Sequence, residues 1–306
     1  MNKESICVFG SLNVDLTVRM ARFHAPGETV TGESFNVYTG GKGGNQAVAA
    51  ARLGADVKLA ACLGTDANGD LYAATLAREG IDAAGVRRLA DVSSGVAVIE
   101  VDDSGENRIV VVPGANARLD AAAADAAREI IASCGLLLLQ LETPLDGVIE
   151  AARIARAAGR TVILDPAPAR PLPDELLALC DYVTPNETEL ATLTGMPVSS
   201  DEEALAACRA LLQRGAKAVV HKRGARGALW VDETHVVAAA GKRVKAVDTT
   251  AAGDTFNAGF AVGLAEGQSV ESALELANAA AAISTTAPGA QTAMPSRSAA
   301  STCCAS

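Results

Sequence analysis

From residue 119 onward, alanine-rich stretches with helical character alternate with short apolar stretches, and turn residues lie between them. The pattern predicts helices over 119–133, 145–158 and 269–283. It predicts strands over 136–141, 161–164, 182–184 and 217–221, and a buried first strand over 6–10. Consecutive strand–helix–strand units place their strands parallel in one sheet. The sequence therefore predicts an α/β fold in which a doubly wound, mainly parallel sheet is flanked by helices.

Composition narrows the function classes. The chain has 306 residues, 49% of them apolar and only 3% aromatic, so its core must consist of Ala, Val, Leu and Ile. The net charge of -10, without runs of Lys or Arg, argues against binding to nucleic acid or an anionic membrane. Seven cysteines without metal-type spacing predict reduced thiols. With no signal peptide or membrane-length apolar span, we expect a cytoplasmic protein.

The stretch 248–259 carries the first chemical signal. Small residues and a glycine precede an apolar run, which predicts that a helix begins at Ala251 to Asp254. The first amides of a helix lack intrahelical partners and attract anions. Asp254 adds a carboxylate that could accept a proton from an attacking hydroxyl, a combination suited to phosphoryl transfer. An ordinary helix capped by Asp254 is the alternative.

The stretch 40–46 carries the second signal, because four of its first five residues are glycine. We expect a loop that lets backbone approach a ligand, with Lys42 and Asn45 as donors, before a helix over 47–53. It is not a Walker A loop, because Gly43 follows Lys42 where Ser or Thr is required. It is not a dinucleotide fingerprint either, because Gln46 replaces the third glycine. A flexible linker is the alternative.

Polar residues follow several predicted strands, at the edge where open α/β sheets bind ligands. Asn13 and Asp15 follow the first strand and could hold sugar hydroxyls, or they could serve turn chemistry alone. Asn186 and Glu189 follow a later strand and could order phosphate and metal-bound water. As the alternative, the two residues could form a capping pair at the start of the helix that follows. The turn over 222–227 could line a nucleotide, although Arg226 could equally be a surface charge.

Two further segments stand apart from the alternation. Residues 95–101 and 107–112 read as a β-hairpin, which together with 17–38 could form a small antiparallel sheet. Such a sheet would be a lid over a ligand cleft or a contact with another subunit, unless it is a fixed edge hairpin. Residues 296–306 show no apolar period, and we expect a disordered tail.

The motifs at 40–45 and 248–254 resemble the two signatures of the ribokinase-type (pfkB) carbohydrate kinases, and the resemblance extends over 6–294. It implies one kinase domain over 1–295, with lid strands from about 15–40 and 95–112, and a homodimer formed through the lid. It implies transfer of phosphate from ATP to O5 of D-ribose. A kinase for deoxyribose, another furanose or a nucleoside is the alternative.

The resemblance also implies a role for individual positions. The pentose would contact Asn13, Asp15, Gly41, Lys42, Gly43, Asn45 and Glu142. Asp254 would be the base, and the amides of Ala251, Ala252, Gly253 and Asp254 would form the anion hole. ATP would contact Asn186, Lys222, Arg223, Gly224, Ala225, Arg226, Gly227, Gly253, Asp254 and Asn278. Members more often carry a neutral pair where this chain has Lys222 and Arg223.

The resemblance implies two kinds of metal ion. Glu189 would help to hold Mg²⁺ through water. A monovalent cation, usually K⁺, would be surrounded by Asp248, Thr250, Ser284, Ala287, Gly289 and Ala293. Two rival classes stay open: a nicotinamide-dependent dehydrogenase, which the absent glycine fingerprint disfavours, and a sugar-responsive binding protein that has lost catalysis, which Asp254 disfavours.

Overall fold

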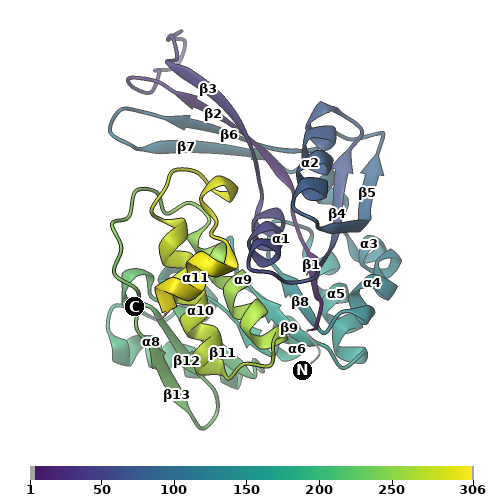
Figure 1. Cartoon of the computed structure of the whole chain (residues 1–306), viewed down its shortest axis with the longest axis vertical. Helices are drawn as coiled ribbons and strands as arrows, with labels where there is room; N and C mark the ends of the chain where they lie inside the picture. Colours follow the sequence, from purple (N-terminus) through teal and green to yellow (C-terminus); the bar gives the residue numbers. More distant parts are fainter. Residues whose placement is uncertain (1–3, 305–306) are drawn as a thin grey trace.

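The computed structural model describes residues 4–304. Its main sheet has nine strands in the order β13-β12-β11-β10-β9-β8-β1-β4-β5 (Figure 1). The strands are β1 (Ile6–Phe9), β4 (Val57–Gly64), β5 (Asp82–Leu89), β8 (Leu136–Leu139), β9 (Thr161–Leu164), β10 (Tyr182–Val183), β11 (Ala218–Lys222), β12 (Ala228–Val231) and β13 (Val236–Ala239). In this sheet β11, β10, β9, β8, β1, β4 and β5 run parallel, whereas β12 pairs antiparallel with both β11 and β13. The predicted α/β fold with a mainly parallel sheet is therefore confirmed.

Helices cover both faces of this sheet (Figure 1). One face carries α1 (Lys42–Arg52), α2 (Ala67–Arg78), α9 (Ala252–Ala265), α10 (Val270–Ser284) and α11 (Arg297–Cys304). The other carries α3 (Ala121–Ala126), α4 (Arg128–Ser133), α5 (Leu145–Ala157), α6 (Asp174–Leu179), α7 (Glu187–Thr194) and α8 (Asp201–Gln213). The side chains of β1 alternate between the two cores, with Ile6 and Val8 in one and Cys7 and Phe9 in the other. Both faces of β1 are buried, as expected for a central parallel strand.

Two helix predictions need correction. The helix predicted over 119–133 is divided at Ala127, which ends α3 and precedes α4. The disordered tail predicted over 296–306 is wrong for Arg297–Cys304, which form α11; residues 305–306 lie outside the described part. Ala300 of α11 is fully buried among residues of α9 and α10, and Arg297 pairs with Glu266 over 2.7 Å. Small side chains make this contact, so the segment has no run of large apolar residues to reveal it.

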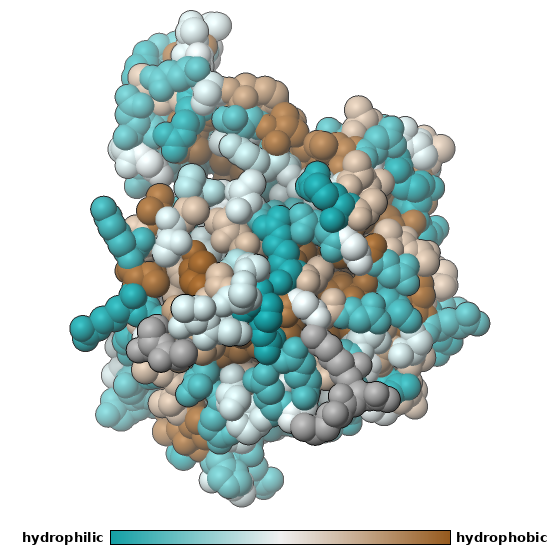
Figure 2. Space-filling model, in the orientation of Figure 1, coloured by the Kyte–Doolittle hydropathy of each residue, from teal (hydrophilic) through white to brown (hydrophobic). Residues whose placement is uncertain are grey.

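A second sheet projects from the body, with the order β3-β2-β6-β7 (Figure 1). Its strands are β2 (Asn13–Arg19), β3 (Ser34–Gly40), β6 (Gly95–Val101) and β7 (Asn107–Val112). The small sheet was predicted to be antiparallel, but β2 and β6 pair in parallel, so it is mixed. Figure 2 shows apolar surface near the base of this sheet, below a mostly polar tip.

The glycines at 40–46 have a structural role that the sequence did not reveal. Helix α1 begins at Lys42, not at residue 47, so most of the predicted loop is helical. Gly41 precedes it with φ 82°, a conformation that favours glycine. A Cβ on Gly43 would lie 2.6 Å from the backbone nitrogen of Ser11, and one on Gly44 only 1.8 Å from the hydroxyl of Tyr72. Gly43 therefore allows α1 to pack directly against the residues that follow β1, and Gly44 allows it to pack against Tyr72 of α2.

Three short 3-10 turns complete the chain: η1 (Gly114–Arg118), η2 (Gly224–Arg226) and η3 (Gln291–Ala293). No helix within residues 4–304 is long and apolar enough to cross a membrane.

Candidate active site

The predicted site residues converge at one edge of the main sheet. Ser11, Glu142, Asp165 and Lys222 end or closely follow the parallel strands β1, β8, β9 and β11. The N-termini of α1 and α9 point to the same edge, because Asn45 of α1 contacts Asp254 of α9. Open α/β sheets bind ligands at this edge. The structure therefore brings both sequence signals, 209 positions apart, into one site.

Asp254 lies in the first turn of α9 and is only 5% exposed. The side-chain amide of Asn45 donates to its Oδ2 over 2.9 Å, and that of Gln46 donates to its Oδ1 over 3.2 Å. Burial raises the pKa of Asp254 to about 6, although the nearby Lys42 opposes the shift. A carboxylate with that pKa is ionised at neutral pH and basic enough to accept a proton from a hydroxyl.

The start of α9 is shaped to hold an anion. Ala251, the residue before the helix, has φ 59°, a left-handed conformation that costs roughly 1–2 kcal/mol for a residue with a Cβ. The amide of Ala252 donates to the carbonyl of Thr249 over 3.2 Å, and that of Thr255 donates to the carbonyl of Ala251 over 2.9 Å. The amides of Gly253 and Asp254 lie between these two, in the turn where the helix dipole favours negative charge.

Two further carboxylates, those of Asp15 and Glu142, lie near the start of α1. The hydroxyl of Ser11 donates to Oε2 of Glu142 over 2.5 Å, and the amide of Lys42 donates to the same oxygen over 3.0 Å. A Cβ on Gly40 would lie 2.2 Å from Oδ2 of Asp15, so the Asp15 carboxylate rests against that glycine. Burial, and then the charge of Glu142, raise the pKa of Asp15 to about 7. The two carboxylates are thus close enough to influence each other electrostatically.

The contact between Asn13 and Asn116 was not predicted from the sequence. Asn13 is buried, and its Oδ1 accepts a hydrogen bond from Nδ2 of Asn116 over 2.8 Å. Asn116 also exchanges hydrogen bonds with the backbone amide and carbonyl of Leu12. Asn116 lies in η1, 103 positions from Asn13, and no local pattern relates the two.

A buried amide network below Asp254 was also missed. Gln140 donates to the side-chain carbonyl of Gln46 over 2.6 Å. Gln46 in turn donates to Asp165 over 3.0 Å and to Asp254 over 3.2 Å. Gln140 and Asp165 each follow a strand, so the position of polar residues after strands was the signal that could have identified them. This network fixes the rotation of the Asp254 carboxylate.

A cavity of about 600 Å³ lies beside the start of α9 and has the size of a nucleotide site. The residues predicted to bind ATP that line it are Lys222, Gly224, Ala225, Gly227, Gly253 and Asn278. Arg223 and Arg226 do not line it, because both side chains instead face Asp201, with Arg226 at 2.8 Å and Arg223 at 3.5 Å. The surface-charge alternative therefore describes Arg226.

A second cavity, of about 420 Å³, adjoins the first at Lys222, Gly224 and Gly253. Its other lining residues include Lys42, Asp165, Asn186, Glu189 and Asp254. Carboxylates raise the pKa of Lys42 above its ordinary value, Asp254 most of all, although burial opposes them. This cavity therefore connects the nucleotide-sized space to the predicted base and contains a positive charge.

Asn186 and Glu189 form the capping pair that was one of their two predicted roles. Oδ1 of Asn186 accepts from the amide of Glu189, and Oε2 of Glu189 accepts from the amide of Asn186, each over 2.8 Å. Both residues also line the second cavity, so capping does not remove them from the site. Within residues 4–304, no group of three or more His, Cys, Asp or Glu residues could hold a metal ion by itself.

The residues predicted around a monovalent cation occupy two adjoining segments. Oδ1 of Asp248 accepts from the amide of Thr250 over 2.9 Å, and its Oδ2 accepts from the amide of Gly289 over 2.8 Å. The amide of Asp248 donates to the carbonyl of Thr285 over 3.1 Å. Burial opposes it, but hydrogen bonds from Thr250 and Gly289 hold the pKa of Asp248 below its ordinary value. Of the remaining members, Ser284 and Ala293 are buried and Ala287 is half-buried.

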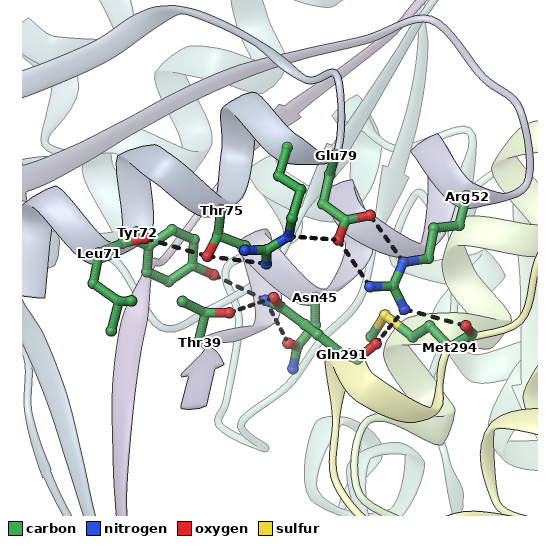
Figure 3. Close-up of polar contacts among 10 residues, drawn as sticks. Thr39, Asn45, Arg52, Leu71, Tyr72, Thr75, Glu79, Gln291 and Met294 are labelled. Carbon is green, nitrogen blue, oxygen red and sulfur yellow. Dashed lines mark hydrogen bonds and ion pairs between the residues drawn. The ribbon is translucent and has the colours of Figure 1, made fainter. Parts of the chain in front are cut away.

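Gln291, in η3, connects this second segment to Asn45, as Figure 3 shows. Its side-chain amide donates to Oδ1 of Asn45 over 3.3 Å and to the hydroxyl of Tyr72 over 3.1 Å. Its Oε1 accepts from the hydroxyl of Thr39, near the end of β3, over 2.6 Å. Because Asn45 accepts from Gln291, its own amide is turned toward Asp254.

Arg52 holds the backbone of η3 in place (Figure 3). Its guanidinium donates to the carbonyl of Met294 over 3.2 Å and to that of Gln291, and it forms a bidentate pair with Glu79 at 2.8 and 2.9 Å. Nothing in the local sequence signals this arrangement, because the partners of Arg52 come from two other parts of the chain, Glu79 and residues 291–294.

The fold and this site, with a buried base, a helix N-terminus and a nucleotide-sized cavity, define a phosphotransferase that acts on a small hydroxylated molecule. The family model described as pfkB family carbohydrate kinase matches residues 3–297. The chain therefore belongs to the pfkB family of carbohydrate kinases, which confirms the family suggested by the two sequence motifs.

Individual relatives agree with this family. The chain is 43% identical to a ribokinase of Haemophilus influenzae over 295 residues, which cover 96% of each chain. It is 39% identical to a deoxyribokinase of Salmonella typhi over 292 residues, which cover 95% of each chain. A solved structure of Arabidopsis thaliana ribokinase in complex with ribose and ATP superimposes with a TM-score of 0.94, at 35% identity over 99% of each chain.

Proposed function

We propose that this protein transfers the γ-phosphoryl group of ATP to O5 of D-ribose, giving D-ribose 5-phosphate and ADP. The observation that carries the proposal is the position of Asp254. It is buried at the N-terminus of α9, it lines the cavity that adjoins the nucleotide-sized one, and two side-chain amides orient it. The ribokinases of Haemophilus influenzae and Arabidopsis thaliana support ribose and ATP as substrates.

The reaction follows from these positions. Asp254 takes the proton of the 5-hydroxyl while the sugar oxygen attacks the γ-phosphorus, and the bond from that phosphorus to the ADP oxygen breaks. The amides of Ala251, Gly253 and Asp254 would face the phosphoryl oxygens and offset their charge, as would the Lys42 ammonium, whereas the amide of Ala252 already donates to the carbonyl of Thr249. The hydrogen bonds from Asn45 and Gln46 keep the Asp254 carboxylate directed at the 5-hydroxyl, so that catalysis consists mainly of positioning.

In this proposal the sugar lies near the start of α1, beside the carboxylates of Asp15 and Glu142. Asp15 and Glu142 accept hydrogen bonds from hydroxyls, Asn13 adds an amide, and the start of α1 from Gly41 to Asn45 closes the remaining side. This set suits a sugar with several hydroxyls. The similarity to a Salmonella typhi deoxyribokinase keeps 2-deoxy-D-ribose as the alternative substrate.

Two metal ions belong to the proposal. Mg²⁺ bound with ATP would neutralise phosphate charge, and the Glu189 carboxylate would help to hold it through water, beside Asn186 at the nucleotide. Asp248 and the backbone carbonyls near it are hard oxygen donors that suit K⁺. Because Asp248 joins residues 248–250 to Gly289, a cation there would stiffen the segment that leads into Ala251 and the anion hole.

We propose that the small sheet is both the lid of the site and the contact between two subunits. We propose in addition that the protein is cytoplasmic. Its strands expose large apolar side chains, among them Phe35 at 60%, Ile109 at 53% and Val110 at 64%. Apolar side chains on exposed strands are typical of surfaces that another chain covers. We propose that a second copy of the chain pairs there.

A sugar panel tests the proposed function. ADP release is measured with D-ribose, 2-deoxy-D-ribose, other furanoses and nucleosides, and phosphorus NMR locates the phosphate on the product. We expect the highest kcat/KM with D-ribose and a phosphate on O5. A preference for 2-deoxy-D-ribose would replace the substrate, and the absence of ADP release with every compound would favour a binding protein. Binding of NADH would favour the dehydrogenase class.

A further inference from the structure

Lys222 has surroundings unusual for a lysine. It ends β11, and its side chain is only 10% exposed. Its Nζ donates to Oδ1 of Asp165 over 2.7 Å and lies 3.7 Å from Oε2 of Glu189. Two carboxylates therefore lie beside an ammonium group that is almost completely buried.

The ammonium group lies where the two cavities meet. Lys222 lines both the nucleotide-sized cavity and the cavity that contains Asp254. A Cβ on Gly253 would be 3.6 Å from Nζ of Lys222, so the ammonium lies beside the first turn of α9. A phosphoryl group that moves from ATP in the first cavity to an acceptor at Asp254 must pass this point.

The ammonium group of Lys222 can donate a hydrogen bond to a ligand in addition to the one that it donates to Asp165. An ammonium group has three donors. Asp165 accepts from it at hydrogen-bond distance, whereas Glu189 lies at 3.7 Å, too far for a normal hydrogen bond. Asp165 also accepts from Gln46, which donates to Asp254. Lys222 is thus fixed relative to the base through two side chains.

We propose that Lys222 is a further catalytic residue, whose ammonium contacts the γ-phosphoryl group of ATP and offsets its charge during transfer. The proposal deepens the proposed function and rests on it. Lys222 acts on the nucleotide side of the phosphoryl group, and Lys42 acts from the start of α1.

The test measures nucleotide binding and turnover separately. Lys222→Met removes the charge and Lys222→Arg keeps it. Lys217→Met removes a half-exposed lysine that immediately precedes the same strand and pairs with Asp181. Binding of Mg·ATP and Mg·ADP is measured by calorimetry without sugar. We expect Lys222→Met to weaken ATP about tenfold or more while ADP changes by less than about twofold.

Turnover is then measured on the same variants. We expect Lys222→Met to lower kcat about 10²-fold, the effect of removing one donor to a developing anion, whereas Lys222→Arg retains the preference for ATP over ADP and Lys217→Met matches the unmodified protein. Equal weakening of ATP and ADP, or an unchanged kcat in Lys222→Met, would overturn the proposal. If Lys222→Met does not fold because Asp165 is left unpaired, Lys222→Met/Asp165→Asn is compared with Asp165→Asn instead.

The binding measurement also separates this inference from the proposed function. If the unmodified protein fails to phosphorylate D-ribose but Lys222→Met still loses ATP affinity selectively, the proposed sugar is wrong and the contact to the γ-phosphoryl group stands. If D-ribose is phosphorylated and the ratio of ATP to ADP affinity is the same in both proteins, the function stands and the role of Lys222 is refuted.

Discussion

The side-chain amide of Asn45 donates a hydrogen bond to Oδ2 of Asp254 over 2.9 Å, from a position 209 residues earlier in the chain. This contact joins the start of α1 to the start of α9. It sets the direction of the proposed base, and it requires that Asn45 present its amide nitrogen rather than its oxygen. Gln291 supplies that constraint from a third segment.

Removing the hydrogen bond from Gln291 to Asn45 should raise the pKa of Asp254. Gln291→Met keeps the volume but leaves Asn45 free to rotate. The hydrogen bond from Asn45 lowers the pKa of Asp254, so its loss should raise that pKa. We expect kcat to fall roughly tenfold and the acid limb of its pH profile to move to higher pH. Thr292→Ala, an exposed neighbour in η3, is the control and should leave the limb near pH 6.

Asp15 should control sugar binding rather than turnover. Its pKa of about 7 means that the carboxylate loses its charge, and with it some capacity to accept sugar hydroxyls, as pH falls through 7. We expect KM for D-ribose to rise below pH 7 while kcat follows Asp254. In Asp15→Asn, KM should be higher and nearly independent of pH between 6 and 8. A pH-dependent KM in that variant would contradict the assignment.

The cation proposal predicts a response to K⁺. Activity measured at constant ionic strength with K⁺ or a bulky organic cation should be higher with K⁺. Asp248→Asn removes the charge that faces the proposed ion and weakens the hydrogen bond from Gly289. We expect this variant to lose most of the K⁺ stimulation. Full stimulation in Asp248→Asn would place the cation elsewhere.

The dimer proposal is tested on β7. Val110 is 64% exposed on the small sheet, and Val110→Asp places a charge on the proposed contact. We expect sedimentation to show a dimer for the unmodified protein and a monomer for Val110→Asp. Val236→Asp makes the same change on β13, where the valine is 47% exposed, and should leave the dimer intact. A monomeric unmodified protein would refute the proposal.

Periodic segments and local motifs could be predicted from the sequence, because their causes lie within a few residues. The strand over 161–164 matches β9, and the helix over 145–158 differs from α5 by one residue. The contacts of Asn45 with Gln291 and of Lys222 with Asp165 could not be predicted, because each depends on tertiary packing. The same is true of Gly44, where a side chain would collide with Tyr72.

The most direct test of the account is the turnover of Asp254→Asn with D-ribose and ATP. Asn has nearly the same shape but cannot accept the proton, and it leaves the nucleotide-sized cavity unchanged. We predict that kcat falls about 10²-fold or more while Mg·ATP binds with near-normal affinity. Near-normal turnover in Asp254→Asn would contradict the proposal that this buried carboxylate is the general base.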